Sequence, residues 1–225
     1  MASTKKTPNI LKHYTSIENL FKILDSEELI LGDPEKWSDK NDSAALHAFC
    51  KLKGDRIKAR AICFLDGEES IYHWQFHAPK GCSISFDRDV ILKQIEGDTE
   101  FLYGKVTYKR EISAAELEKL RHKNIEKIPF IKRNQYKCEE EYRIIWFGTG
   151  TAQKIKFKRK PDIKSITLSP EIAEIIREKI QDHLKEKYKI DIVKLSRVLE
   201  SQEKWISKFE NLGKRNPKNR KTQQS

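Results

Sequence analysis

The stretch Cys138-Glu139-Glu140-Glu141-Tyr142-Arg143-Ile144-Ile145-Trp146-Phe147 places three acidic residues directly before an apolar run. The run Tyr142–Phe147 is rich in aromatic and β-branched residues and predicts a buried strand. Where the strand extends back, Glu139 and Glu141 lie two residues apart and share one face. Two carboxylates this close repel each other, so the pair needs cationic neighbours or solvent, or one carboxyl must take a shifted pKa.

Two interpretations of this glutamate pair stay open. In the first, the acidic run is a solvated strand entry beside Lys132, Arg133 and Lys137, and it forms ordinary structural ion pairs. In the second, the pair performs acid/base or ribose-hydroxyl chemistry. Arg143 continues the same face, where it either pairs with Glu141 or contacts a phosphate through its bidentate guanidinium.

A second segment, His13–Leu24, predicts a short strand followed by a helix. The helix has one apolar stripe, formed by Ile17, Leu20, Phe21 and Leu24. Thr15 with Glu18 predicts a capping box, so His13 and Tyr14 should end the strand. The join exposes backbone N–H groups, which favour an anionic ligand such as pyrophosphate. The alternative for His13 is a hydrogen-bonded strand histidine.

Together these segments resemble a bacterial family, the Domain of Unknown Function 2971 family. The likeness covers roughly residues 11 to 197. It rests on His13-Tyr14-Thr15-Ser16 with the helix that follows, an Asn-Asp loop at Asn41-Asp42, a Cys-Phe strand at Ile62–Phe64, Trp74, a Lys-Gly strand at Lys80–Asp87, the Glu-x-Glu-x-Arg element of Glu139, Glu141 and Arg143, and a late strand at Asp162–Leu168.

The order of these motifs is also similar to the layout of ADP-ribosyltransferases, including toxins that modify nucleic acid. The resemblance implies that His13, with Tyr14 and Thr15, binds NAD as a substrate, and that Arg143 contacts its phosphates. It implies an aromatic ring stacked on nicotinamide, supplied by Tyr72, Trp74 or Phe76. It further implies that Glu141 stabilises the oxocarbenium-like transition state, with Glu139 as the alternative.

The expected function is therefore that of an NAD-utilising ADP-ribosyltransferase-like effector, a glycosyltransferase of the toxin or antiviral-defence kind, with a nucleic acid or protein acceptor. Ser83-Ile84-Ser85 lacks the central Thr of the Ser-Thr-Ser element found in arginine-modifying transferases, so arginine is not the expected acceptor. The alternative is a non-catalytic nucleic-acid-binding accessory protein on the same scaffold, with a structural glutamate pair. A nuclease is a third interpretation, which lacks a supporting metal cluster or His pair.

The charge of the chain favours anionic partners. Its 225 residues include 45 Lys and Arg against 34 Asp and Glu, a net charge of +11. Five of the eleven charges lie in residues 201–225, whose polar end, Gly213–Ser225, either tracks phosphates or only solubilises the protein. The alternation of Lys with Ile and Phe in Lys154–Lys160 predicts an exposed edge strand or, alternatively, a nucleic-acid groove.

The remaining pattern predicts one α+β domain over residues 10–200, with a central mixed β-sheet flanked by helices. A flexible N-terminus, 1–9, precedes it, and a basic helix with a disordered tail, 201–225, follows. Strands are expected at Ile10–Tyr14, Leu29–Leu31, Arg60–Leu65, Cys82–Phe86, Lys105–Tyr108, Tyr142–Phe147, Lys154–Lys158, Ile163–Leu168 and Ile190–Leu195. Helices are expected at Ile17–Asp25, Ala44–Lys51, Ala114–Asn124, Pro170–Tyr188 and Val198–Asn211. Ser169 should cap the helix that starts at Pro170 and buries Ile172, Ile175, Ile176, Ile180 and Leu184.

The cysteines predict a reduced, cytoplasmic protein, because Cys50, Cys63, Cys82 and Cys138 have no CxxC spacing. The N-terminus has no apolar signal segment, and no window approaches about 18 apolar residues, so neither secretion nor a membrane span is expected. His73 and His77 are spaced to share a helix face. A third ligand and the Glu of an HExxH motif are missing, so no metal site is expected.

Overall fold

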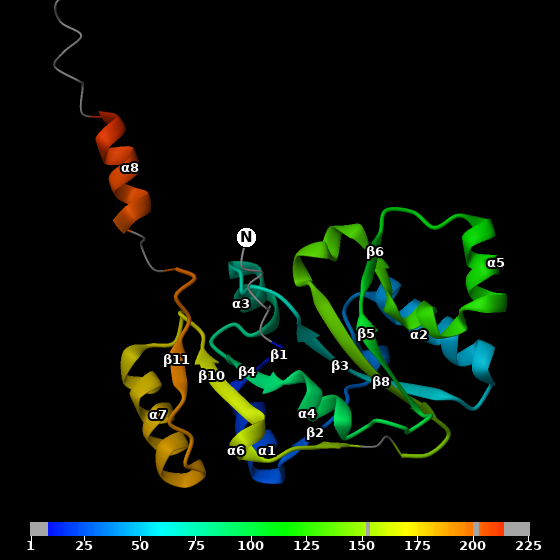
Figure 1. Ribbon diagram of the computed structural model, residues 1–225, viewed down its shortest axis with the longest axis horizontal. Coiled ribbons are helices and arrows are strands. Elements are labelled where there is room, and N and C mark those ends of the chain that lie inside the picture. The colour runs from blue at the N-terminus through cyan, green and yellow to red at the C-terminus, as the bar shows by residue number, and fades with distance from the viewer. Residues whose placement is uncertain (1–8, 152–153, 200–202, 214–225) are drawn as a thin grey trace, which may run out of the picture.

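The computed structural model of the chain describes residues 9–151, 154–199 and 203–213. Its centre is a seven-stranded sheet (Figure 1). From edge to edge the strands are β11 (Val193–Leu195), β10 (Ile163–Leu168), β4 (Cys82–Asp87), β1 (Ile10–Thr15), β3 (Lys58–Leu65), β8 (Glu141–Gly148) and β5 (Phe101–Lys105). Only β10 and β11 pair in parallel, and the other neighbours are antiparallel. The predicted α+β class with a central mixed sheet is confirmed.

Helices flank this sheet, and two small strand pairs lie beside it (Figure 1). The helices are α1 (Ile17–Ser26), α2 (Lys40–Lys53), α3 (Ile71–His77), α4 (Arg88–Lys93), α5 (Ala114–Lys123), α6 (Arg159–Asp162), α7 (Glu174–Tyr188) and α8 (Glu203–Gly213). Short 3-10 helices are η1 (Pro34–Lys36), η2 (Ile125–Phe130) and η3 (Asn134–Glu139). The small pairs are β2 (Glu28–Leu29) with β9 (Ile155–Lys156), and β6 (Thr107–Lys109) with β7 (Ile131–Arg133).

The sheet is buried on both faces, which explains the unbroken apolar run of β8. On one face, Ile144 and Trp146 belong to the main core, which also contains Leu20 of α1 and Leu184 of α7. On the other face, Ile145 packs in a second core with residues of α2. A strand covered on both sides needs apolar residues at successive positions. The same layering places the first turn of α2 over the polar start of β8.

The strand-to-helix join near the N-terminus forms as predicted, with a different cap. Ser16, not Thr15, is the N-cap of α1, and its hydroxyl accepts from the Asn19 N–H at 3.1 Å. Thr15 stays in β1, opposite Cys82 in β4. Leu20 and Leu24 of the predicted stripe are fully buried. The hydroxyl of Ser16 replaces that of Thr15 because the strand continues one residue further than expected.

The prediction for the long C-terminal helix was wrong at its start. α7 begins at Glu174, and the Ser169 hydroxyl instead accepts from the Glu171 N–H in the preceding turn. The buried residues of α7 are Ile180, Leu184 and Tyr188. Its first turn lies beyond this core contact, so Ile175 and Ile176 are exposed rather than buried.

Three further element predictions need correction. The strand expected at Lys105–Tyr108 is two strands that break at Val106, whose N–H donates to the Glu141 carbonyl. In the predicted edge strand Lys154–Lys158, only Ile155 and Lys156 pair, although the alternating burial holds. Asp39 caps α2 four residues earlier than expected, so the Asn-Asp motif lies in a helix and not in a loop.

Other expectations are only partly covered by the described residues. The N-terminal residues 1–8 and the polar tail 214–225 lie outside them. Among the described residues, no helix is long and apolar enough to cross a membrane. The four cysteines are free; Cys138 is exposed, while Cys50 and Cys82 are buried.

Candidate active site

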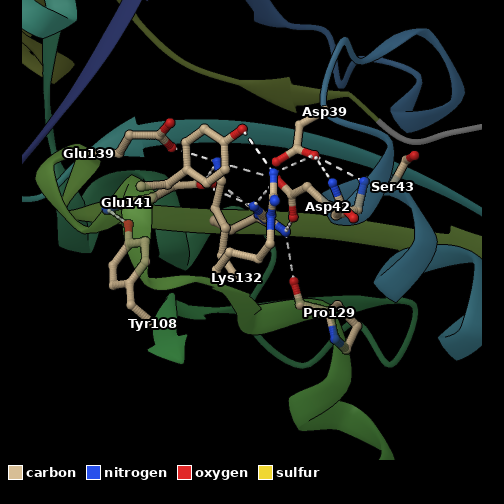
Figure 2. Close-up of polar contacts among 12 residues, drawn as sticks. Asp39, Asp42, Ser43, Tyr108, Pro129, Lys132, Glu139 and Glu141 are labelled. Carbon is tan, nitrogen blue, oxygen red and sulfur yellow. Dashed lines mark hydrogen bonds and ion pairs between the residues drawn. The ribbon is translucent and has the colours of Figure 1, made fainter. Parts of the chain in front are cut away.

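A buried ion-pair network lies where α2 crosses the start of β8 (Figure 2). Its centre is Arg143, which is fully buried and uses all of its guanidinium N–H groups. Nε and NH2 donate to Glu141 at 2.6 and 2.9 Å. NH1 and NH2 donate to the two oxygens of Asp42 at 3.0 and 2.9 Å, and NH1 also donates to the Pro129 carbonyl at 2.8 Å. The guanidinium is therefore engaged by protein groups, so Arg143 as placed does not offer it to a phosphate.

Lys132, on β7, joins this network to the second glutamate (Figure 2). Its Nζ donates to Glu139 at 2.5 Å and to Glu141 at 3.1 Å, and it lies 3.3 Å from Asp42. All three carboxylate side chains are less than a tenth exposed. The pair is therefore not a solvated strand entry. One ammonium group holds the two glutamates together.

The backbone brings the two glutamates together in an unexpected way. Glu139 ends η3, Glu140 adopts a left-handed conformation with φ 39°, and β8 begins at Glu141. The prediction that Glu139 and Glu141 occupy one strand face was wrong, because only Glu141 is in the strand. The left-handed residue turns the chain so that the Glu139 side chain still reaches Lys132, while Glu140 is exposed.

The two carboxyl groups are electrostatically unequal. Burial alone would raise the pKa of Glu141, but Arg143 and Lys132 outweigh it and lower that pKa to about 2. Burial raises the pKa of Glu139, and in this case the attraction of Lys132 does not compensate. One carboxylate is held ionised while its neighbour is biased toward protonation. Paired carboxyls with pKa values pushed apart are an arrangement that active sites use for acid/base work.

Helix α3 covers the outer side of Glu139 with aromatic side chains. The Tyr72 hydroxyl donates to Glu139 Oε1 at 3.1 Å, and His77 Nε2 lies 3.9 Å from the same oxygen. Ser70 N–H donates to His73 Nδ1, so the neutral ring carries its proton on Nε2, which faces the Glu139 carbonyl at 3.4 Å. Tyr72 and His73 thus attach α3 to the backbone and side chain of Glu139.

The candidate stacking rings differ in exposure. Trp74 is fully buried; its Nε1 donates to Glu69, and its ring lies edge-on to Tyr14 at 4.9 Å. Phe76 is 69% exposed and stacks on Tyr72, with ring centroids 4.6 Å apart and an interplanar angle of 27°. As placed, Trp74 cannot stack on a bound ring, whereas Phe76 presents an open ring face.

His13 and Tyr14 point to opposite faces of the sheet. Lys12 pairs with Leu65, which pairs with Glu141, so Lys12 and Tyr14 share the face of the glutamates. His13 points to the other face, where its ring lies 5.7 Å from that of Phe64, and its Nδ1 lies 3.1 Å from the Cys63 carbonyl. The structure thus does not bring the His13 ring together with Glu141, but it does place Tyr14 against α3.

Tyr14 has a feature expected of a ligand contact. Its hydroxyl and that of Ser83, which lies opposite in β4, are buried facing each other, and neither has another hydrogen-bond partner among the described residues. Two hydroxyls that face only each other leave hydrogen-bonding capacity unused. Thr15, the third predicted cofactor contact, is buried in β1.

Two hollows lie elsewhere: one of about 450 Å³ is lined by Asp182, Lys185, Glu186, Lys189 and Asp191, and one of about 130 Å³ lies between η1 and α2. No group of metal-ligating side chains is present among the described residues.

Several residues of the site were not foreseen from the sequence. Asp42 is 101 residues from Arg143 and belongs to a helix whose start was predicted too late. The Tyr108 hydroxyl accepts from the Glu141 N–H at 2.9 Å, yet no periodic pattern distinguishes this tyrosine. Asp39 could have indicated the position of Asp42 from the sequence. As a capping residue it sets the start of α2 and so places Asp42 in the first turn.

No family model matches the chain, so the resemblance to the Domain of Unknown Function 2971 family is not supported by one. No curated protein matches either. A solved structure of DarT from Thermus sp. 2.9 in complex with ADP-ribosylated single-stranded DNA is similar, with 13% identity and a TM-score of 0.41 over 87% of this chain and 96% of that chain. At this TM-score the similarity identifies neither the family nor the function of this chain.

Proposed function

We propose that the protein transfers ADP-ribose from NAD to a nucleic acid or protein acceptor, as a toxin-type or defence effector. The observation that carries this proposal is the pair Glu139 and Glu141, held by one lysine with pKa values shifted in opposite directions. Transfer of a glycosyl group needs a carboxylate beside the positive charge that develops on the sugar. The chain supplies such a carboxylate beside an aromatic helix.

In this proposal the two glutamates have different roles. Glu141 is a positioning residue, because Arg143 and Lys132 occupy its oxygens. Glu139 is the carboxylate that meets the reactants, since its Oε1 faces Tyr72 and His77 at the outer side. This order reverses the expectation drawn from the resemblance, in which Glu141 was the catalytic residue and Glu139 the alternative.

The proposed step breaks the bond between nicotinamide and C1′ of the ribose, and the electron pair leaves with the nicotinamide nitrogen. Positive charge develops on the sugar and is stabilised by the Glu139 carboxylate. A nitrogen or oxygen of the acceptor then bonds to C1′, and its proton passes to Glu139. The Tyr14 and Ser83 hydroxyls, which face each other, have further hydrogen-bonding capacity for the donor. Thr15 ends the same strand, whereas the His13 ring lies on the opposite face of the sheet.

A non-catalytic nucleic-acid-binding protein is the second candidate. One observation favours it: the Asp42, Glu141 and Arg143 groups satisfy one another fully and need no ligand. In that case the network only anchors α2 to β8, and the positive charge of the chain provides the binding.

Nicotinamide release from NAD, measured by chromatography with single-stranded DNA, RNA or a protein mixture as acceptor, separates the two. Glu139→Gln should lower release by about 100-fold, since the charge is lost and the shape is kept. Glu140→Gln, one residue along and exposed, is the matched control and should stay within a few-fold of wild type. Wild-type protein that releases no nicotinamide with any of these acceptors would favour the binding protein.

A further inference from the structure

The two oxygens of the Glu139 carboxylate have different hydrogen-bond partners. Oε2 accepts from Lys132 Nζ at 2.5 Å, whereas Oε1 accepts from the Tyr72 hydroxyl at 3.1 Å. His77 Nε2 lies 3.9 Å from Oε1, which is beyond hydrogen-bonding distance. Among the residues that the structure describes, the Tyr72 hydroxyl is therefore the one group that donates a hydrogen bond to Oε1.

The lysine alone does not keep Glu139 ionised. Lys132 Nζ also lies 3.3 Å from Asp42 and 3.1 Å from Glu141, so its charge is shared among three carboxylates. Burial raises the pKa of Glu139 in spite of that lysine. A donor on Oε1 acts in the opposite direction, because a hydrogen bond to the ionised form of a carboxyl group favours that form. A neutral hydroxyl does so without cancelling the negative charge, which a second cation would do.

Tyr72 is held in place to make this hydrogen bond. Its ring stacks on that of Phe76, with centroids 4.6 Å apart, and the next residue, His73, is buried and accepts from the Ser70 N–H. Burial and the nearby charge of Glu139 raise the pKa of Tyr72, so its hydroxyl remains a donor at neutral pH. A hydrogen bond between side chains that are already ordered costs little further conformational entropy.

We propose that Tyr72 is a positioning residue that holds Glu139 in its ionised form. The inference rests on the proposed function only for its catalytic consequence, which is that a charged carboxylate faces the developing ribosyl cation at neutral pH. Tyr72 acts through Glu139 and not on the reacting atoms. Without the hydroxyl, Glu139 would need a higher pH to ionise.

Other groups around Glu139 carry charge or titrate, and a test of Tyr72 has to separate them from it. They are Lys12 of β1, His73 and His77 of α3, Tyr108 of β6, Lys132 of β7, Lys137 and Cys138 of η3, Glu140, and Glu141 with its neighbours Asp42 and Arg143. Burial lowers the pKa of both histidines, which brings them toward the range in which Glu139 titrates. His77→Gln, which cannot titrate, therefore provides a second background.

The test is a double-mutant cycle of Tyr72→Phe and Glu139→Gln in the full chain, followed by urea unfolding between pH 8 and pH 4 without NAD. Phe keeps the ring that stacks on Phe76 and removes only the hydroxyl. At pH 8 we expect a coupling of about 10-fold or more in the unfolding equilibrium constant, because a hydrogen bond to an ionised group is strong. The coupling should fall to about 2-fold or less at pH 4, since Glu139 takes up its proton as the pH falls through its pKa.

Two variants control this cycle. The same decline of the coupling with pH should appear in the His77→Gln background, because the titrating group is Glu139. Tyr103→Phe removes a hydroxyl from β5 on a side chain that is 43% exposed, and it should show no coupling to Glu139→Gln. A coupling that does not change with pH, or one that disappears in His77→Gln, would overturn the inference about Tyr72.

Nicotinamide release provides the catalytic readout and keeps this inference apart from the proposed function. In Tyr72→Phe the acid limb of the pH profile should move up by about one pH unit, with the rate at high pH within a few-fold of wild type. A pH-dependent coupling without any nicotinamide release would refute the transferase and leave the role of Tyr72 in place. The same coupling with release whose acid limb does not move would show that Glu139 is not the reacting carboxylate.

Discussion

Replacing the two glutamates of the pair one at a time should change stability in different ways, although they share one lysine. A carboxyl whose pKa falls from 4.5 to about 2 on folding stabilises the folded state at neutral pH by about 3 kcal/mol. Glu141→Gln removes that stabilisation and leaves Arg143 in a buried site with one anion fewer. For a chain of this size, the loss corresponds to a fall in melting temperature of about 6 to 12 °C.

Glu139→Gln should not destabilise in this way. Its pKa is raised by burial, so its negative charge disfavours the folded state relative to a neutral group of the same shape. The amide oxygen of Gln can still accept from Lys132, and its NH2 group can donate to the Tyr72 hydroxyl, because the two partners contact different oxygens of Glu139. We therefore expect stability within about 1 kcal/mol of wild type at pH 7, or slightly above it.

The assay is urea unfolding followed by tryptophan fluorescence, with Glu140→Gln as the exposed control. Trp37, which lies 5.1 Å from the Arg143 guanidinium, reports on the network directly. The pH dependence provides a second check. The folded pKa of Glu141 is below the unfolded value, so its contribution is complete above pH 4.5 and declines as the pH falls toward 2. The free-energy difference between wild type and Glu141→Gln should shrink over that window. A pH-independent difference, or Glu139→Gln more destabilising than Glu141→Gln, would refute the assignment of charges.

Three further predictions concern other parts of the chain. NAD should raise the melting temperature of wild type, and His13→Ala should reduce that shift if the end of β1 contacts the donor; no shift at saturating NAD would count against a donor site. Removing Gly213–Ser225 should lower nucleic-acid affinity and flatten its salt dependence with little change in stability, and unchanged binding would place the main contacts elsewhere. Ser16→Ala should lower the free energy of unfolding by about 1 kcal/mol, and Thr15→Ser should lower it much less, because Thr15 does not cap the helix. Equal losses for the two variants would contradict the cap assignment.

Burial pattern explains which elements could be predicted. β8, β10 and α1 follow the predicted ranges within about two residues, because continuous apolar runs and a clear helical stripe leave few alternatives. α7 shows where this fails. Ile175 and Ile176 fit the apolar period, yet their exposure depends on where the neighbouring core ends, and a local pattern carries no information about that.

The site was predictable only where its contacts are local. The pairing of Arg143 with Glu141 follows from their spacing on one strand and is present. The contact of Arg143 with Asp42 joins segments 101 residues apart and depends on how α2 crosses the sheet. The position of the Glu139 side chain depends on the backbone of Glu140, which has a positive φ. That conformation is usual for Gly or Asn, so a glutamate at this position does not predict it.

The charge balance of the network indicates which carboxylate is free to react. Asp42, Glu139 and Glu141 face Lys132 and Arg143, so three anions share two cations. Arg143 pairs with Asp42 and Glu141 through hydrogen bonds, and Lys132 contacts all three carboxylates, with Glu139 the nearest. One negative charge is therefore in excess when all three carboxyls are ionised, and Glu139 is the member whose charge Lys132 alone compensates, because Arg143 does not contact it. Binding of a cationic group beside Glu139, such as a nicotinamide ring or a developing ribosyl cation, would relieve this excess, and transition-state charge of that sign is what a transferase of this kind must stabilise.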